Sequence, residues 1–301
     1  MGKSRHLGAA IALATCCVAG CASIRRDRGS EQVLAARQMA LRGVEALQQG
    51  KNEQAEQLFS ESLDLCPVEE RAHRYYGELL WERGSRQAAL QHMEQSAALS
   101  DGAVDVLVRL GDMQLEQGQL AEALRWADNA VERDHRYAAA WSLRSEVLLR
   151  QGRLQESLYS CHQALNLQPE FLAVELRAAR IYQQQNRHRR ALSTLDVVIS
   201  RYPAEQIPVE VLDQQSECLI ALNRHAAAEQ RLAAAAVRAP SPDRLRRLCQ
   251  LQRSMGRPRD ALSSIEQALA MAPLDHDSQL LYHELAGNAV QQTAAVAPEQ
   301  R

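Results

Sequence analysis

Short amphipathic segments alternate with turn residues from about residue 31 to residue 290. Within each segment, apolar residues recur at intervals of three and four, which predicts helices rather than strands. The stretch 141–169 shows the unit most clearly, because apolar residues follow helical spacing on both sides of Gly152 and Pro169 closes it. A glycine in the middle and a proline at the end predict two helices joined by a turn.

A small residue repeats along the chain at a nearly constant interval. The interval is 34 residues four times, then 37 and then 33, as the positions show: Ala55, Ala89, Ala123, Ser157, Ala191, Ala228 and Ala261. The residue twelve positions earlier is also small in each unit, from Gly43 to Cys249. Two antiparallel helices that cross closely leave no room for a branched side chain at such points. The pattern therefore predicts seven helical hairpins in one register.

A second column predicts where the first helix of each hairpin ends. Five residues before each repeated small residue stands Gly or Asn: Gly50, Gly84, Gly118, Gly152, Asn186, Asn223 and Gly256. These two residue types tolerate the left-handed backbone conformation best, so we expect a positive φ at all seven positions. Proline then closes the second helix in five of the seven units: Pro67, Pro169, Pro203, Pro240 and Pro273.

The period, the small columns and the closing proline together resemble the tetratricopeptide repeat (TPR). The resemblance implies an all-α, right-handed solenoid of about seven hairpins with a capping helix. The hairpins would lie at about 36–69, 70–103, 104–137, 138–171, 172–205, 209–242 and 243–275, with the capping helix at 276–290. Three extra residues near Pro203–Pro208 predict a small break, and residues 291–301 are predicted to be disordered.

The first 20 residues have the order of a bacterial signal peptide. Lys3 and Arg5 precede an apolar run that is too short to span a bilayer. The sequence Val18-Ala19-Gly20-Cys21 that follows resembles the lipobox of bacterial lipoproteins. This resemblance implies a lipid on Cys21, a tether over residues 21–30 and, because Ala22 follows, a place on the outer membrane facing the periplasm. An ordinary cleaved signal is the alternative.

Composition and motifs restrict the chemistry. Hydrophobic residues make up 46% of the chain and aromatic residues 4%, which favours Leu/Ala-rich helices. The net charge is −2, so nucleic acid is disfavoured as a partner. No HExxH, GxSxG or GxGxxG motif occurs, which predicts no enzyme activity, metal or cofactor.

Four cysteines lie within the predicted repeats: Cys66, Cys161, Cys218 and Cys249. We expect them to be small apolar packing residues, since no metal spacing relates them. An oxidising periplasm would also permit a disulfide, and Cys218 with Cys249 is the pair to consider.

The TPR resemblance also implies that the first helix of each hairpin lines a concave groove. The groove positions in the second to fourth hairpins are Arg74, Glu78, Trp81, Glu82, Asp112, Leu115, Glu116, Glu146 and Leu149. An apolar line beside acidic residues suits a peptide with apolar anchors and basic flanks, and a half-exposed Trp81 would be the main anchor. Alternatively, the apolar line is packing and the acids form a solvated face.

Arginines gather on the fifth and seventh hairpins: Arg187, Arg189, Arg190, Arg244, Arg246, Arg247, Arg253, Arg257 and Arg259. A solvated or acid-paired face is one interpretation, and a docking site for an acidic partner or lipid headgroups is the other.

The resemblances imply a membrane-anchored scaffold that binds another protein or peptide. Lipoproteins of this build include pilotins of pilus secretins and adaptors that recruit cell-wall enzymes. Two other classes stay open, namely a regulatory subunit that shares a site with an envelope enzyme, and a carrier with a closed apolar cavity.

Overall fold

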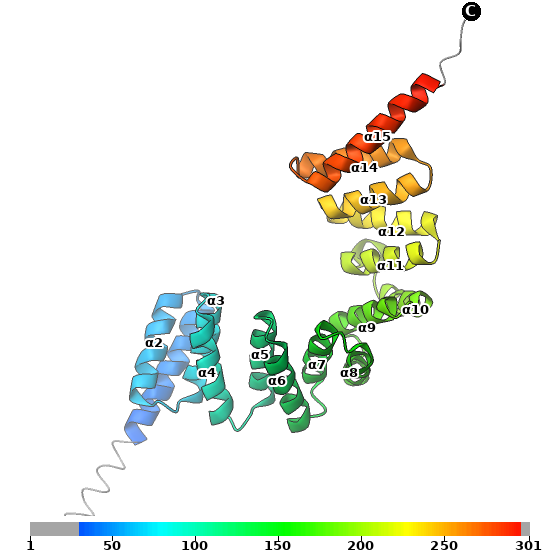
Figure 1. Cartoon of the computed structure of the whole chain (residues 1–301). Coiled ribbons are helices and arrows are strands. Elements are labelled where there is room, and N and C mark those ends of the chain that lie inside the picture. Colours follow the sequence, from blue (N-terminus) through cyan, green and yellow to red (C-terminus); the bar gives the residue numbers. More distant parts are fainter. Residues whose placement is uncertain (1–29, 296–301) are drawn as a thin grey trace, which may run out of the picture. The chain divides into compact units, whose positions relative to one another are not determined.

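The computed structural model describes the backbone of residues 30–295 and the side chains of residues 30–287, and this part is helical with no strand. A helix over residues 30–48 is followed by α2 (Asn52–Leu65), α3 (Glu70–Glu82), α4 (Arg86–Leu99), α5 (Val104–Glu116), α6 (Leu120–Arg133), α7 (Ala138–Arg150), α8 (Leu154–Leu167), α9 (Leu172–Gln184), α10 (His188–Ile199), α11 (Val209–Ala221), α12 (His225–Arg238), α13 (Pro242–Ser254), α14 (Pro258–Met271) and α15 (His276–Ala295) (Figure 1). The predicted all-α solenoid of helical hairpins is confirmed.

The chain forms two compact units, which we call unit 1, up to Val147, and unit 2, from Leu148 onward. The boundary therefore falls within α7. The three extra residues near Pro203–Pro208, where the sequence predicts a small break in the solenoid, include a turn of 3₁₀ helix, Ala204–Gln206.

The repeated small residues lie at the close helix crossings that the sequence predicts. All seven, from Ala55 to Ala261, are completely buried. A Cβ atom added to Gly43 would stand 2.5 Å from the Phe59 ring, and one added to Gly111 would stand 2.5 Å from a methyl group of Leu143. A larger side chain at either glycine would force the helices apart, which explains the small column.

The turn column is also confirmed. The backbone φ is positive at all seven predicted positions, between 56° at Asn223 and 83° at Gly84. Where no proline closes the second hairpin, from 70 to 103, Asp101 and Gly102 both take positive φ values, 53° and 72°. This extra left-handed pair ends α4 in place of proline.

The C-terminal helix is longer than predicted. α15 runs to Ala295, so the predicted end at residue 290 and the predicted disorder of 291–295 are wrong. The segment is rich in Ala and Gln, which favour helix, and the next proline is Pro298. No helix within residues 30–295 is long and apolar enough to cross a lipid bilayer.

Candidate functional site

The first helix of a hairpin carries three residues on one face at matching places in each repeat. In α3 these are Glu78, Trp81 and Glu82, which are three and four residues apart and so share a helix face. We call this set and its equivalents the inner-face positions. In α11 they are Glu217, Ile220 and Ala221, and in α13 they are Gln250, Arg253 and Ser254.

Trp81 does not stand half-exposed, as the sequence analysis expects of an anchor. Its side chain is 5% exposed and packs against the core of unit 1, and Leu115, its equivalent in α5, is 6% exposed. The indole Nε1–H donates to Glu116 Oε2 at 3.2 Å, and the guanidinium of Arg86 lies over the ring at 4.0 Å. The expected exposure is therefore wrong, because Glu116 and Arg86 close over the ring.

The acidic residues of unit 1 are engaged by arginines from a neighbouring first helix. Arg109 on α5 donates three hydrogen bonds of 2.7–2.9 Å to the carboxylate of Glu78 on α3. These bonds raise the pKa of Arg109, although burial acts against them. Arg74 likewise donates to Asp105 at 2.5 Å. Glu78 is thus neutralised within the chain, and sequence reasoning missed Arg109 because it lies outside the inner-face positions.

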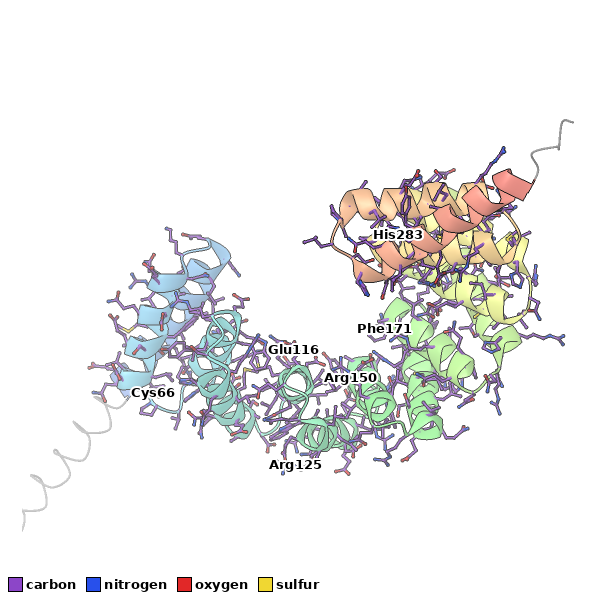
Figure 2. The ribbon with its side chains drawn as sticks, turned by 45° about the horizontal axis from the view of Figure 1, so that its top comes forward. Cys66, Glu116, Arg125, Arg150, Phe171 and His283 are labelled. Carbon is purple, nitrogen blue, oxygen red and sulfur yellow. The ribbon has the colours of Figure 1, made fainter. Side chains whose placement is uncertain are left out.

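The other predicted groove residues of unit 1 lie at the surface. Glu82 and Glu116 are exposed, and Asp112 and Glu146 are half-buried. Leu149, in the same column as Trp81, lies in unit 2 and is half-buried. Figure 2 marks Glu116 at the end of α5. The structure thus brings together Glu78, Trp81 and Glu116 around Arg109.

Unit 2 has a pocket of about 490 Å³ at the same repeat positions. It lies between the first helices α11 and α13, and its lining consists of Glu217, Ile220, Ala221, His225, Arg247, Gln250, Leu251 and Ser254. Five of these eight occupy inner-face positions. The predicted groove positions end at the fourth hairpin, and the same register carried forward from Leu149 by 34 and 37 residues reaches Ile220.

The apolar and charged groups of this pocket are separated. Leu251 is buried and Ile220 half-buried, so apolar side chains form its floor. Arg247 donates to Glu217 at 2.9 Å across the gap between α13 and α11, and these two side chains are 26% and 50% exposed. A hollow with an apolar floor and a polar rim is typical of a site for an apolar side chain of a ligand.

Most arginines of the seventh hairpin are paired with acids. Arg244 forms a bidentate pair with Asp213, and the others bind carboxylates at 2.5–2.9 Å: Arg246 to Asp243 and Asp275, Arg247 to Glu217, Arg253 to Glu284, and Arg257 to Glu229 and Asp260. The acid-paired interpretation therefore holds for these five residues.

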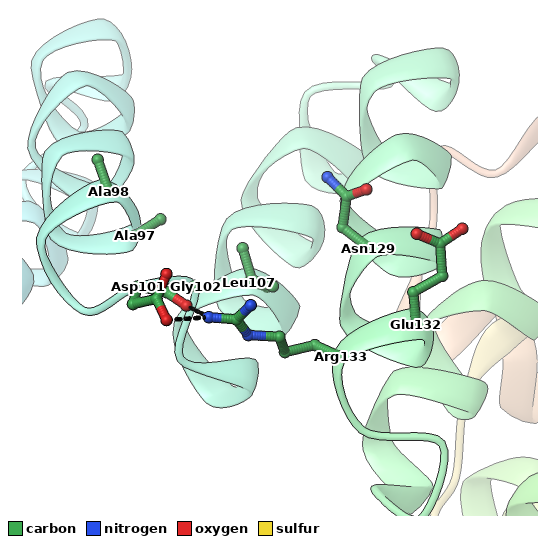
Figure 3. A pocket seen from close by; sticks show the side chains of 8 residues that line it. All are labelled: Ala97, Ala98, Asp101, Gly102, Leu107, Asn129, Glu132 and Arg133. Carbon is green, nitrogen blue, oxygen red and sulfur yellow. Dashed lines mark hydrogen bonds and ion pairs between the residues drawn. The ribbon is translucent and has the colours of Figure 1, made fainter.

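A second pocket, of about 500 Å³, lies in unit 1 between α4 and α6 (Figure 3). Arg133 reaches across it to the carboxylate of Asp101 at 2.6 Å and also to the Asp101 carbonyl. The figure shows Asn129 and Glu132 on α6 facing Ala97 and Ala98 on α4. The ion pair fixes the left-handed turn at Asp101 and Gly102, so we assign this pocket a structural role.

The cysteines have no reactive setting. Cys66, Cys161, Cys218 and Cys249 are buried, and Cys218 and Cys249 form no disulfide here. Burial raises the pKa of Cys218 to about 11 and raises that of Cys249. Within the described residues no group of three or more His, Cys, Asp or Glu side chains could hold a metal ion.

The predictions for the N-terminus, including Cys21, fall on residues 1–29, which lie outside the described part of the chain.

Comparison with solved structures supports the fold. A tetratricopeptide repeat protein from Parabacteroides merdae superposes with a TM-score of 0.65 at 11% identity, covering 84% of this chain and 99% of that one. Yeast Tom70 gives a TM-score of 0.56 at 16% identity over 90% of this chain and 57% of its own. YrrB, described as a TPR protein with an unusual peptide-binding site, gives 0.50 at 16% identity over 62% of this chain and 95% of its own.

No curated protein matches the chain. Family models of the tetratricopeptide repeat match residues 41–104, 80–147 and 148–207. These matches together span residues 41–207, which is more than half of the 301 residues. The chain therefore belongs to the tetratricopeptide-repeat family.

Proposed function

We propose that the chain is a lipid-anchored scaffold that binds a peptide segment of a partner protein in the α11–α13 pocket. Repeats of this family present binding surfaces for other proteins. The observation that carries the proposal is the pocket of about 490 Å³ at the inner-face positions of unit 2. In unit 1 the equivalent Trp81 and Leu115 are buried, so that face offers less apolar surface to a partner.

The lining defines the chemistry of the bound segment. Ile220, Ala221 and Leu251 offer an apolar floor for one bulky apolar side chain. The amide of Gln250 and the hydroxyl of Ser254 are exposed at the rim, where they can bond to a peptide backbone. Glu217 and Arg247 neutralise each other, so we expect an anchor side chain that is apolar and uncharged.

The anchor is proposed from the sequence of residues 1–30. The lipobox-like Val18-Ala19-Gly20-Cys21 supports lipidation of Cys21, and Ala22 supports retention at the outer membrane, facing the periplasm. On this basis the scaffold would assist assembly of an envelope complex without being an enzyme itself, in the manner of a pilotin or of an adaptor for cell-wall enzymes. A regulatory subunit with a shared site is the alternative; a ligand carrier fits less well, because the described α11–α13 pocket is open to solvent.

A matched pair of substitutions tests the pocket. Ala221→Trp places an indole in it, whereas Ala226→Trp adds the same exposed side chain on α12, outside the lining. With a photo-crosslinking amino acid at Gln250 of the lipidated protein in its own membrane, we expect a crosslinked partner. Ala221→Trp should reduce that crosslink at least about tenfold, and Ala226→Trp should leave it unchanged. Equal crosslinking in both variants would place the partner elsewhere.

The anchor has its own test. In cells fed radiolabelled palmitate, Cys21→Ser should abolish incorporation of label into the chain, because the proposed acyl acceptor is removed. Label that persists in the Cys21→Ser variant would contradict lipidation at this residue. The result does not depend on the pocket, so the two parts of the proposal fail separately.

A further inference from the structure

A pocket of about 360 Å³ lies between α10 and the turn that joins α11 to α12. Its lining consists of Arg189, Leu192, Ser193, Asp196, Leu222 and Arg224. None of these residues lines the α11–α13 pocket, so an inference from this site stands apart from the proposed function.

Two arginines meet at this pocket without an ion-pair partner, and Asp196 is the single acid in its lining. Neither Arg189 nor Arg224 has a carboxylate within salt-bridge distance among the residues whose side chains the structure describes, and both are exposed. On the seventh hairpin, by contrast, five arginines all have carboxylate partners. Two guanidinium groups at one small pocket repel each other, and a bound anion would remove that cost.

The turn before the second helix shows the same contrast between hairpins. Arginine stands there four times, at Arg153, Arg187, Arg224 and Arg257. Arg153 binds Glu156 at 2.6 Å and Arg257 binds Asp260 at 2.6 Å, in both cases three residues later. Three residues after Arg187 and Arg224 stand Arg190 and Ala227 instead. The fifth and sixth hairpins therefore lack the acid that neutralises this arginine elsewhere.

We propose that this pocket binds a phosphate group carried as a singly charged diester. Two guanidinium forks from separate elements can donate to the several oxygens of a tetrahedral phosphate, whereas a carboxylate is satisfied by a single fork. The Ser193 hydroxyl is a further donor. Leu192 and Leu222 provide apolar contact for the carbon atoms that flank the phosphate.

Asp196 sets the charge of the ligand. Its Oδ1 accepts a hydrogen bond from Gln215 Nε2 at 2.6 Å, which fixes the carboxylate at the pocket wall. Two arginines and one aspartate leave the pocket with one net positive charge, which matches a phosphodiester better than a doubly charged monoester. The second Asp196 oxygen is available to accept from a hydroxyl of the ligand. The headgroup of an anionic phospholipid and a soluble diester share this chemistry.

The test measures binding of sn-glycero-3-phosphoglycerol to the full chain by isothermal titration calorimetry. Arg189→Gln and Arg224→Gln remove the two charges, while Arg259→Gln removes an exposed charge on α14 outside the pocket. We expect saturable binding to the unsubstituted chain and to Arg259→Gln, with binding weakened about tenfold in each pocket variant. Melting temperatures should agree among all four proteins, because neither pocket arginine has an ion-pair partner to lose.

Equal affinities in all four proteins, or no saturable binding, would overturn the proposal. Acetate binding as tightly as the diester, with the same dependence on Arg189 and Arg224, would also overturn it, since the pocket would then be one for carboxylates. Phosphatidylglycerol vesicles then distinguish the two sources of the phosphodiester, a lipid headgroup and a soluble molecule. Displacement of the soluble diester by vesicles identifies a lipid headgroup, and lack of displacement identifies a soluble diester.

Discussion

Units 1 and 2 contain the same ion pair at the same repeat positions, but the surface beside it differs. Glu78 binds Arg109 in unit 1, and Glu217 binds Arg247 in unit 2. Beside the first pair lies the buried indole of Trp81, and beside the second lies a pocket with Ile220 in its lining. The repeat register thus fixes where a side chain lies. The size and the partners of that side chain decide whether the surface beside the ion pair stays open to a ligand.

A second difference explains why the unit 1 face is closed. Glu116 accepts from the Trp81 indole, so two successive first helices are joined across the face. The residue that takes the place of Glu116 in α13 is Ser254, which bonds its own helix at the Leu251 carbonyl. Arg253, equivalent to Leu115, binds Glu284 on α15 instead. Between α11 and α13, whose side chains the structure describes, no indole–carboxylate bridge is therefore formed.

The largest effect that should separate the units is a loss of stability at the tryptophan. Trp81→Ala removes a buried indole from the core and should lower the free energy of unfolding by about 3–5 kcal/mol. Ile220→Ala, at the equivalent place in unit 2, should cost about 1 kcal/mol because that side chain is half-buried. Urea unfolding followed by circular dichroism measures both. Similar losses would show that the two faces are packed alike.

The next effect concerns the recurring ion pair. Arg109 makes three hydrogen bonds to Glu78, whereas Arg247 makes one to Glu217. Double-mutant cycles with alanine should give a coupling energy of about 1 kcal/mol for the first pair and about 0.3 kcal/mol for the second, since partly exposed pairs contribute little. A coupling in unit 2 as strong as that in unit 1 would mean that the pocket rim is as rigid as the closed face.

Much of the fold follows from the sequence, because each repeated column answers a local requirement. The positive φ at Asn186 and the close helix approach at Gly43 each restrict the residue type at that one position, so each can be recognised in the sequence. The site could be predicted less well. Whether Trp81 is an anchor or a core residue depends on Glu116, 35 residues later, and on Arg86 above the ring, and no periodic pattern specifies such a pairing.

The division into units was also beyond the sequence. The insertion near Pro203–Pro208 is the largest change of period, whereas the boundary between the units lies at Val147 and Leu148, inside α7. The spacing of the small residues stays at 34 from Ala55 to Ala191, across that boundary, and so gives no sign of it.

The smallest predicted effect is a pH dependence of unit 1. His73 and His92 lie with their Nδ1 atoms 2.9 Å apart, and His73 Nε2 lies 3.0 Å from the Pro67 carbonyl. If His73 donates to that carbonyl in its neutral form, its Nδ1 accepts from His92. The ring of Tyr76, whose hydroxyl donates to Glu56, covers His92 at 4.7 Å. A proton added to His92 would therefore have to be accommodated beside the rings of His73 and Tyr76.

Burial first, and the neighbouring His73 second, lower the pKa of His92. In the unfolded chain the pKa returns to about 6.5, so below that pH the unfolded chain binds a proton that the folded chain excludes. Stability should therefore be full above pH of about 6.5 and fall as the pH drops toward the folded value. His92→Gln should remove part of this slope, narrowing the difference in melting temperature between about pH 5 and pH 7.5 by roughly 1–2 °C. In unit 2, loss of hydration beside Tyr182 first, and the neighbouring Arg190 second, also lower the pKa of His162. His162 is more exposed than His92, so His162→Gln should change the slope less. An unchanged slope in His92→Gln would show that the pair opens freely and takes up its proton in the folded state.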